Sequence, residues 1–152
     1  MNPQPFQIRR ADVAALLALR HAILRAGLPA DSARFEGDDE PTAIHLAVER
    51  DGQIIGCCTL IRRPFEGQPA WQLRGMAVDG SVQRSGVGEA LLREVDRIVR
   101  ASETPRLWCN ARAPASGFYG KNGWIEVGRV FEIPTAGPHI RMLRNWDGCA
   151  GS

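Results

Sequence analysis

The chain has 152 residues, of which 44% are hydrophobic and 24% are charged. This length is typical of one domain, and the apolar fraction is sufficient for a hydrophobic core. Nineteen Lys and Arg against seventeen Asp and Glu give a net charge of +2, which argues against nucleic acid binding through bulk electrostatics. No apolar stretch has the length of a membrane-spanning helix. We therefore expect one cytoplasmic domain at 1–146 and a flexible tail at 147–152, with neither nucleic acid nor a membrane as partner.

Before residue 80, apolar spacing and turn residues indicate strands, one helix and a hairpin. Asp12 is expected to be the N-cap of the helix, and Asp51-Gly52 is typical of a two-residue hairpin turn. The expected elements are a strand at 6–9, a helix from Asp12 to Gly27, a polar loop at 30–42, and strands at 44–49, 53–62 and 71–78.

After residue 80, the pattern predicts two helices and three strands. Val87, Leu91 and Val95 recur at helical spacing in the first helix, and Pro134 and Pro138 separate the last two strands. The expected elements are helices at 86–101 and 114–121 and strands at 107–110, 124–130 and 131–142. This order predicts an α+β fold with a mixed, mostly antiparallel sheet.

The four cysteines are Cys57, Cys58, Cys109 and Cys149, and no two of them form a C-x-x-C pair. Zinc or thioredoxin-like chemistry is therefore not indicated, and we expect no metal. The first three are expected to be small buried hydrophobes in a reducing compartment.

A glycine-rich segment, Q-R-S-G-V-G at 83–88, follows an apolar strand and opens a helix. The first N–H groups of a helix have no internal partner, so they attract anions. Gly86 and Gly88 allow close approach to the backbone, and Arg84 adds a permanent charge. No Lys follows Gly88, and the third glycine of a dinucleotide fingerprint is missing. The segment predicts binding of a diphosphate or another anion.

A second segment, L-W-C-N-A-R-A-P-A-S-G-F-Y-G-K-N-G-W at 107–124, combines a strand that ends at Asn110 with a short helix. The helix carries Phe118 and Tyr119, and Gly123 follows near its C-terminal end. Of the two neighbouring aromatic residues, Phe118 is the better candidate for the core.

Together these two segments resemble the GCN5-related N-acetyltransferase (GNAT) superfamily, whose acetyl-CoA motif is Arg/Gln-x-x-Gly-x-Gly/Ala. Residues 73–78 and 137–142 are similar to strands of a bacterial GNAT subgroup, and the resemblance extends from Phe6 to Met142. It implies a GNAT-like sheet with helices on both faces, in which strands 4 and 5 splay apart around the acyl-CoA site.

The resemblance also implies roles for individual residues. Tyr119 corresponds to the tyrosine that lies beside the sulfur of CoA, where a phenol can protonate the departing thiolate. The residues implied to bind acetyl-CoA are Met76, Ala77 and Val78 by main-chain pairing with pantetheine, Gln83, Arg84, Ser85, Gly86, Val87 and Gly88 at the diphosphate, and Asn110, Ser116 and Tyr119 near pantetheine and sulfur.

The general base and the acceptor site are less defined by sequence. His139 is the first candidate for the base because imidazole titrates in the useful range, and His45 and Glu49 are alternatives. Arg74 is a candidate for binding an acidic or phosphorylated acceptor if its side chain faces the cleft. Arg20 and Arg25 have the same chemistry, but we expect them to be surface arginines.

The sequence is therefore identified with an N-acetyltransferase that moves an acetyl group from acetyl-CoA to a primary amine by direct attack. The acceptor is a small-molecule amine or a protein amine, and the resemblance makes a homodimer a reasonable expectation. Two alternatives stay open: a non-catalytic CoA-binding regulatory module of the same fold, and an unrelated α+β domain whose glycine loop binds another phosphate ligand.

Overall fold

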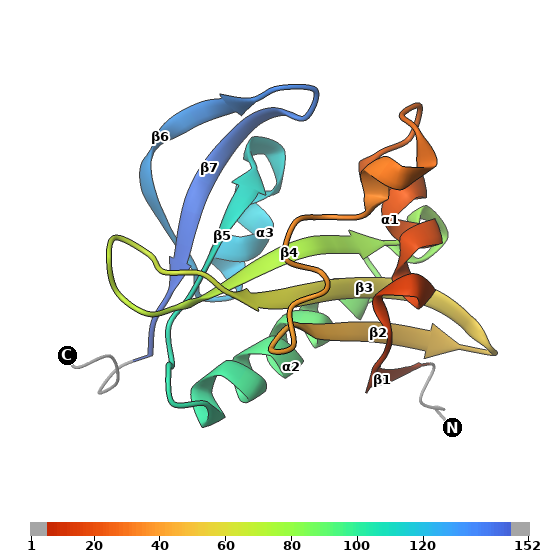
Figure 1. The fold of residues 1–152 in the computed structure, drawn as a ribbon, viewed down its shortest axis with the longest axis horizontal. Helices are drawn as coiled ribbons and strands as arrows, with labels where there is room; N and C mark the ends of the chain where they lie inside the picture. Colours follow the sequence, from red (N-terminus) through yellow and green to blue (C-terminus); the bar gives the residue numbers. More distant parts are fainter. Residues whose placement is uncertain (1–5, 147–152) are drawn as a thin grey trace. The chain divides into compact units, whose positions relative to one another are not determined.

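A computed structural model describes residues 6–146 (Figure 1). The strands are β1 (Gln7–Arg10), β2 (Ile44–Arg50), β3 (Gln53–Arg62), β4 (Trp71–Val78), β5 (Leu107–Arg112), β6 (Ile125–Ile133) and β7 (Gly137–Arg144). The α-helices are α1 (Leu17–Leu24), α2 (Val87–Ala101) and α3 (Ser116–Lys121), and the 3-10 turns are η1 (Val13–Leu16), η2 (Ala30–Ala33), η3 (Gly80–Val82) and η4 (Ala113–Ala115).

The seven strands follow the order β1-β2-β3-β4-β5-β7-β6. The pairs β1–β2, β2–β3, β5–β7 and β6–β7 are antiparallel, whereas β4 and β5 are parallel. The parallel ladder joins Trp71 to Leu107 and Gln72 to Trp108, at the first two residues of each strand. The predicted α+β fold with a mixed, mostly antiparallel sheet is confirmed.

The chain divides into two compact units, which we describe separately. The first contains the described residues up to Ile61 together with Arg74–Val95, and the second contains Arg62–Leu73 and the described residues from Asp96 onward. Strand β4 and helix α2 contribute residues to both units. One domain at 1–146 stays a prediction, and the proposed tail at 147–152 lies outside the described residues.

In the first unit, α1 and α2 cover opposite faces of β3. Neighbouring residues of a strand point to opposite faces. Cys57 packs in one cluster with Leu16, Leu19, Ala47 and Ala77, which places α1 and its preceding turn on that face. A Cβ atom added to Gly56 would lie 2.8 Å from Val87 Cγ1, so the glycine is in close contact with the first turn of α2.

A buried ion pair holds the segment between α1 and β2. Arg20 is completely buried, and its Nη1 and Nη2 donate to Asp38 Oδ2 at 2.8 Å and Oδ1 at 3.0 Å. Nη1 also donates to the carbonyl of Ala33. The expectation that Arg20 is a surface arginine is therefore wrong, because a carboxylate from the polar segment 30–42 accompanies it into the core.

The same ion pair belongs to a closed ring of hydrogen bonds. Arg20 Nη2 donates to Thr59 Oγ1 at 2.7 Å, and Thr59 Oγ1 lies 2.8 Å from His45 Nδ1. His45 Nε2 lies 3.0 Å from the main-chain oxygen of Asp38, which can only accept, so Nε2 carries the proton. A neutral His45 with a protonated Nε2 satisfies every contact in the ring.

Three local features differ from the sequence-based expectations. Asp12 precedes η1 rather than an α-helix, and its side chain makes no capping hydrogen bond. The segment expected to be a loop at 30–42 contains the short turn η2. Strand β5 continues to Arg112, so Asn110 lies inside the strand instead of at its end, because residues 107–112 all pair with β7.

The second unit has its own apolar cluster. Phe65, Ala70, Trp108 and Leu143 pack together, and the ring centroids of Phe65 and Trp108 are 5.5 Å apart. Trp108 Nε1 also donates to the main-chain oxygen of Arg63. These contacts attach the segment between β3 and β4 to β5 and β7.

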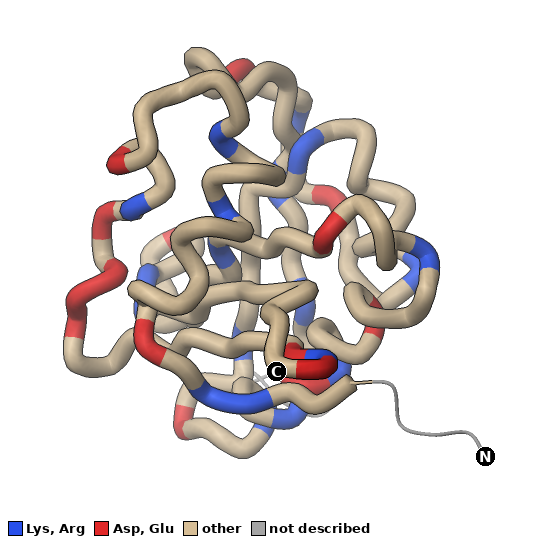
Figure 2. The backbone as a smooth tube through the Cα atoms, turned by 90° about the vertical axis from the view of Figure 1, so that its right-hand side faces the viewer, with Lys and Arg blue, Asp and Glu red and all other residues tan. Residues whose placement is uncertain are grey.

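Both basic and acidic residues are distributed along the backbone (Figure 2). Within residues 6–146, the helices are too short or too polar to cross a membrane.

We expect the Asp38→Ala variant to lower the free energy of unfolding by about 3–5 kcal/mol, because it leaves the Arg20 charge buried without its partner. Urea unfolding at pH 7 measures this change. Asp39→Ala is the matched control: Asp39 is an exposed neighbour, so its substitution is expected to change stability by less than about 0.5 kcal/mol. Equal effects of the two variants would contradict a structural role for the pair.

The pH dependence of stability supplies a further readout for the same pair. Burial raises the pKa of Asp38, but hydrogen bonds from Arg20 and the Phe35 N–H, with the charge of Arg20, outweigh it and leave this pKa below its ordinary value. A lowered pKa gives stability above the unfolded value of about 3.9 that is lost as pH falls through the folded value. The difference between wild type and Asp38→Asn should therefore shrink below about pH 4.

Candidate functional site

The glycine-rich segment forms an irregular turn between β4 and α2. Asp79 Oδ1 accepts hydrogen bonds from the Ser81 N–H at 2.9 Å and from its hydroxyl at 2.8 Å, which shapes the exit from β4. These bonds hold the pKa of the exposed Asp79 below its usual range. Gln83 Nε2 then donates to the main-chain oxygen of Val78. The side chains of Gln83, Arg84 and Ser85 are exposed.

Two residues of this turn have left-handed backbone conformations. Arg84 has φ +68° and Gly86 has φ +92°. The conformation is unstrained for glycine but costs about 1 kcal/mol or more for Arg84. Strained non-glycine residues cluster at ligand-binding sites, so this outlier favours a functional loop.

The start of α2 leaves main-chain N–H groups without acceptors in the helix. The first helical hydrogen bond of α2 runs from the Ala90 N–H to the Gly86 carbonyl, so the N–H groups of Val87, Gly88 and Glu89 have no acceptor within the helix. A Cβ atom added to Gly86 would meet nothing within 4 Å, which leaves open space above the turn. The Val87 side chain is buried, so only its main chain is available to a ligand.

Strand β4 is kinked just before the residues implied to pair with pantetheine. Gly75 has φ +61°, and a Cβ atom there would lie 2.9 Å from Arg20 Nε and 3.1 Å from Phe35 Cε2. Only glycine fits this position. Ala77 is buried in the core, whereas Met76 and Val78 are partly exposed.

In the second unit, Asn110 has an unsatisfied polar atom. Its Oδ1 is buried and has no hydrogen-bond partner among the described residues. A buried unpaired acceptor is costly, so this oxygen suits a ligand that brings an N–H group, such as a pantetheine amide. Ser116, the first residue of α3, is half-buried.

Tyr119 is the buried residue of α3. Its ring makes edge contacts with Trp124 at 5.2 Å and with Phe118 at 5.4 Å between centroids. Phe118 is less buried than Tyr119, so the expectation that Phe118 is the better core residue is wrong. The chain leaves α3 through Gly123, whose φ is +95°. The next residue, Trp124, is buried, and its ring packs against that of Tyr119.

The three candidates for the general base have different surroundings. His139 is buried on β7, and its Nδ1 lies 2.8 Å from the Gly137 carbonyl, which leaves the acceptor lone pair on Nε2 in a neutral ring. Both ring nitrogens of His45 are engaged in the Arg20–Asp38 ring of hydrogen bonds. Glu49 forms an ion pair with Arg9 at 2.7 Å. These contacts favour His139.

Arg74 points from β4 toward a segment that the sequence did not single out. Its Nη1 donates to the main-chain oxygen of Glu36 at 2.7 Å, and its guanidinium lies 6.0 Å from the centroid of Phe35. Phe35 also contacts Arg20 and Arg25. No sequence motif marks Phe35, because an isolated aromatic residue in a polar segment has no characteristic spacing.

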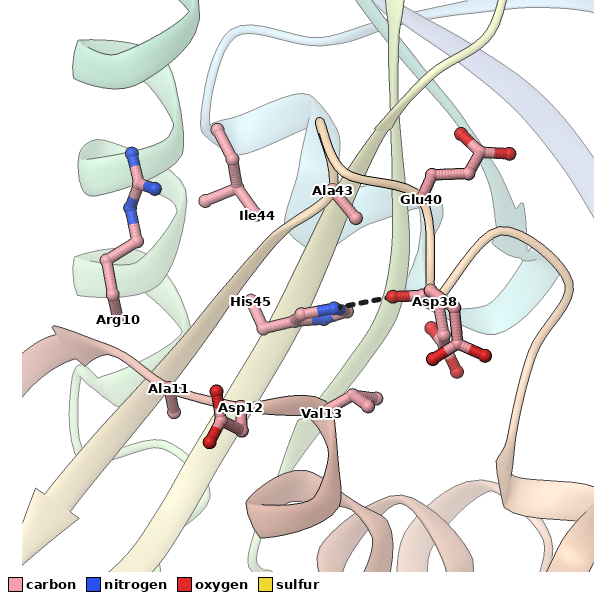
Figure 3. Close-up of a pocket in the computed structure, with 10 residues that line it drawn as sticks. Arg10, Ala11, Asp12, Val13, Asp38, Glu40, Ala43, Ile44 and His45 are labelled. Carbon is pink, nitrogen blue, oxygen red and sulfur yellow. Dashed lines mark hydrogen bonds between the residues drawn. The ribbon is translucent and has the colours of Figure 1, made fainter.

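The first unit also contains a pocket of about 340 Å³ that is lined by residues other than those implied to bind acetyl-CoA (Figure 3). Figure 3 shows the His45 ring and its hydrogen bond to Asp38 beside the pocket. The residues that line the pocket are Arg10, Ala11, Asp12, Val13, Asp38, Asp39, Glu40, Ala43, Ile44 and His45. In the described part of the chain, no three His, Cys, Asp or Glu side chains are arranged to hold a metal ion.

The three described cysteines are buried free thiols, as expected. Burial raises the pKa of Cys57 to about 11, against the opposing positive charge of Arg20. Burial raises the pKa of Cys58 and that of Cys109 further. Thiolate nucleophiles are therefore suppressed at these positions at neutral pH.

Comparison with known proteins places this geometry in a family. Residues 41–126 match the model of the acetyltransferase (GNAT) domain. The uncharacterized N-acetyltransferase YitI of Bacillus subtilis (strain 168) is 30% identical over 144 residues, which cover 91% of this chain and 95% of that protein.

Solved structures share the fold. Escherichia coli ElaA superposes with a TM-score of 0.78 at 18% identity, over 92% of this chain and 99% of that one. An aminoglycoside 6'-N-acetyltransferase complexed with coenzyme A has a TM-score of 0.72 at 18% identity, over 91% of this chain and 96% of the other.

We expect the native protein to resist thiol labelling. In a Cys149→Ser variant, Ellman's reagent at pH 8 should leave Cys57, Cys58 and Cys109 unmodified over minutes, and all three should react in guanidinium chloride. Absorbance of the released thiolate measures both states. Rapid labelling of one equivalent in the native state would contradict the burial of these thiols.

Proposed function

Because the chain belongs to the GNAT acetyltransferase family, we propose that it transfers an acetyl group from acetyl-CoA to a primary amine by direct attack. The family makes it an acyltransferase. The observation that carries the choice of donor is the turn before α2, where N–H groups at the helix start have no acceptor within the helix and the space beside Gly86 is open. A diphosphate is the chemical group that such a turn binds best.

Individual residues have separate proposed roles in binding acetyl-CoA. The main chain of Met76, Ala77 and Val78 pairs with pantetheine as an added strand would. Asn110 Oδ1 accepts from a pantetheine amide, which would satisfy its buried and unpaired oxygen. Ser116 is proposed as a further polar contact. The residues proposed for the diphosphate are Gln83, Arg84, Ser85, Gly86, Val87 and Gly88.

The proposed chemistry needs no covalent enzyme intermediate. The amine nitrogen forms a bond to the thioester carbon, the carbon–sulfur bond breaks, and the thiolate leaves. His139 Nε2 takes a proton from the amine, because the hydrogen bond from Nδ1 to Gly137 leaves its lone pair there. Tyr119 gives a proton to the thiolate. No metal is required in this scheme.

A non-catalytic CoA-binding module would use the same binding residues, and turnover distinguishes it from an enzyme. A homodimer and a cytoplasmic location stay predictions from the sequence and the resemblance.

Acetyl-CoA should raise the melting temperature by about 5–10 °C when present at about one hundred times its Kd, since binding at that ratio adds about 2.7 kcal/mol. Differential scanning fluorimetry measures the shift, with ATP and NAD as controls. A shift with ATP or NAD and none with acetyl-CoA would reject the proposed donor. Arg84→Gly keeps the left-handed conformation but removes the charge, so it should reduce the shift without unfolding the protein.

Tyr119→Phe should lower kcat about 10- to 100-fold while leaving the Kd for acetyl-CoA unchanged, because only proton transfer is lost. Phe118→Leu, on the same helix, is the control for altered packing. His139→Gln, which lacks the basic ring nitrogen, should also lower kcat in the same assay. Unchanged turnover in Tyr119→Phe would remove the phenol from the mechanism.

A further inference from the structure

The segment between α1 and β2 carries an aromatic ring that three arginines contact. The centroid of Phe35 lies 4.3 Å from Arg20 Cζ, 4.8 Å from Arg25 Cζ and 6.0 Å from Arg74 Cζ. We name Phe35, Arg25 and Arg74 the arginine platform, with Arg20 buried beneath it. The arginines come from α1, from its C-terminal end and from β4, so the fold gathers them at one ring.

The charges of these arginines are compensated very unequally. The Arg20 guanidinium is completely buried and has both oxygens of Asp38 within 3.0 Å. Arg74 lies 3.5 Å from the carboxylate of Glu36, and 73% of the Glu36 side chain is exposed. An exposed contact at this distance contributes little free energy. This contact therefore compensates the charge of Arg74 only weakly.

Guanidinium groups packed on an aromatic ring are oriented for recognition. Arg74 carries five N–H donors, and its contacts with Glu36 use only Nη1. The hydrogen bond from Nη1 to the Glu36 carbonyl and the contact with Phe35 hold the guanidinium in place, which lowers the entropy lost when an oxyanion binds in its fork. Partial exposure, with 29% of the Arg74 side chain accessible, keeps the group within reach of a ligand.

The platform also lies next to the strand proposed to bind pantetheine. Arg74 precedes Met76 by two residues on β4, which corresponds to about 7 Å of strand. Gly75 between them has no side chain that would separate the two regions. A small acceptor held by Arg74 at one end therefore has its other end close to the Met76–Val78 segment.

From these observations we infer that the acceptor is an amine that also carries an oxyanion, a carboxylate or a phosphate, which Arg74 binds at the arginine platform. This inference rests on the proposed function and specifies its substrate class. Arg25 adds positive charge to the platform, and Phe35 orients both guanidinium groups. Arg74 is a binding residue for the acceptor and has no role in proton transfer.

The inference is tested with pairs of amines, of which one member carries an anionic group and the other is neutral. The anionic group lies several bonds from the nitrogen, so that the basicity of the two amines is similar. The pairs are 4-aminobutyrate with its carboxamide, phosphoethanolamine with ethanolamine, and glucosamine 6-phosphate with glucosamine. Release of CoA from acetyl-CoA gives kcat/KM for each. The anionic member should be preferred by about 10- to 100-fold, the effect of one charged hydrogen-bonded pair. The carboxylate and phosphate arms show which oxyanion is favoured.

Variants separate binding of the acceptor from binding of the donor. Arg74→Gln should raise KM for the anionic member about 10- to 100-fold and leave KM for the neutral member unchanged. Arg74→Lys, which keeps the charge but loses the fork, should restore part of the preference. Arg93→Gln, at an exposed position on α2, is the matched control and should change neither value.

The outcomes are distinct for the two proposals. A melting shift with acetyl-CoA that persists in Arg74→Gln shows that the donor site is intact. With that shift present, equal rates within every pair that is acetylated, or a preference that survives Arg74→Gln, would overturn the anionic acceptor. Turnover of no pair would reject acetyl transfer, and the acceptor with it, in favour of the non-catalytic CoA-binding module. Absence of the shift in wild type would instead reject the proposed function.

Discussion

A charged pair inside the first unit, Arg20 with Asp38, connects α1, the segment 33–38, β2 and β3 through hydrogen bonds. Two ions taken out of water are tolerated only when geometry and additional hydrogen bonds compensate for lost hydration. Here Nη1 and Nη2 of Arg20 both donate hydrogen bonds, to the Ala33 carbonyl and to Thr59 as well as to Asp38. His45 connects Thr59 to the main chain of Asp38. A polar segment with little apolar content is thereby held against α1 and β3.

The consequences of that pair extend to β4. Asp38 Oδ2 also accepts from the Phe35 N–H at 2.7 Å, so the same carboxylate that neutralises Arg20 positions the aromatic ring. Phe35 and Arg20 together occupy the space beside Gly75, which excludes a side chain there. Gly75, whose φ is +61°, therefore has no room for a side chain, and it lies directly before the Met76–Val78 segment.

Local sequence signals predicted most of the fold, whereas charged residues in the core could not be anticipated. The hairpin at Asp51-Gly52 and helix α2 follow from a few neighbouring residues, and both occur where expected. Arg20 and Asp38 are eighteen positions apart, and each on its own resembles a solvated residue. Their burial follows only from the tertiary pairing. For the candidate site, the glycine motif located the turn before α2 but gave no indication of Phe35. The absence of a hydrogen-bond partner for Asn110 Oδ1 among the described residues could not be predicted either, because it depends on neighbours in space.

The contact between Gly56 and Val87 links the packing of the first unit to its ligand chemistry. The side chain of Val87 packs against β3, and its N–H group is one of those at the start of α2 that have no acceptor within the helix. A methyl group at Gly56 would lie 2.8 Å from Val87 Cγ1, so either Val87 at the start of α2 or strand β3 would have to shift. A random screen for variants with weaker donor binding would therefore recover substitutions at Gly56, in the middle of a buried strand. Such a variant would weaken binding through the packing of α2, although Gly56 itself would not contact the ligand.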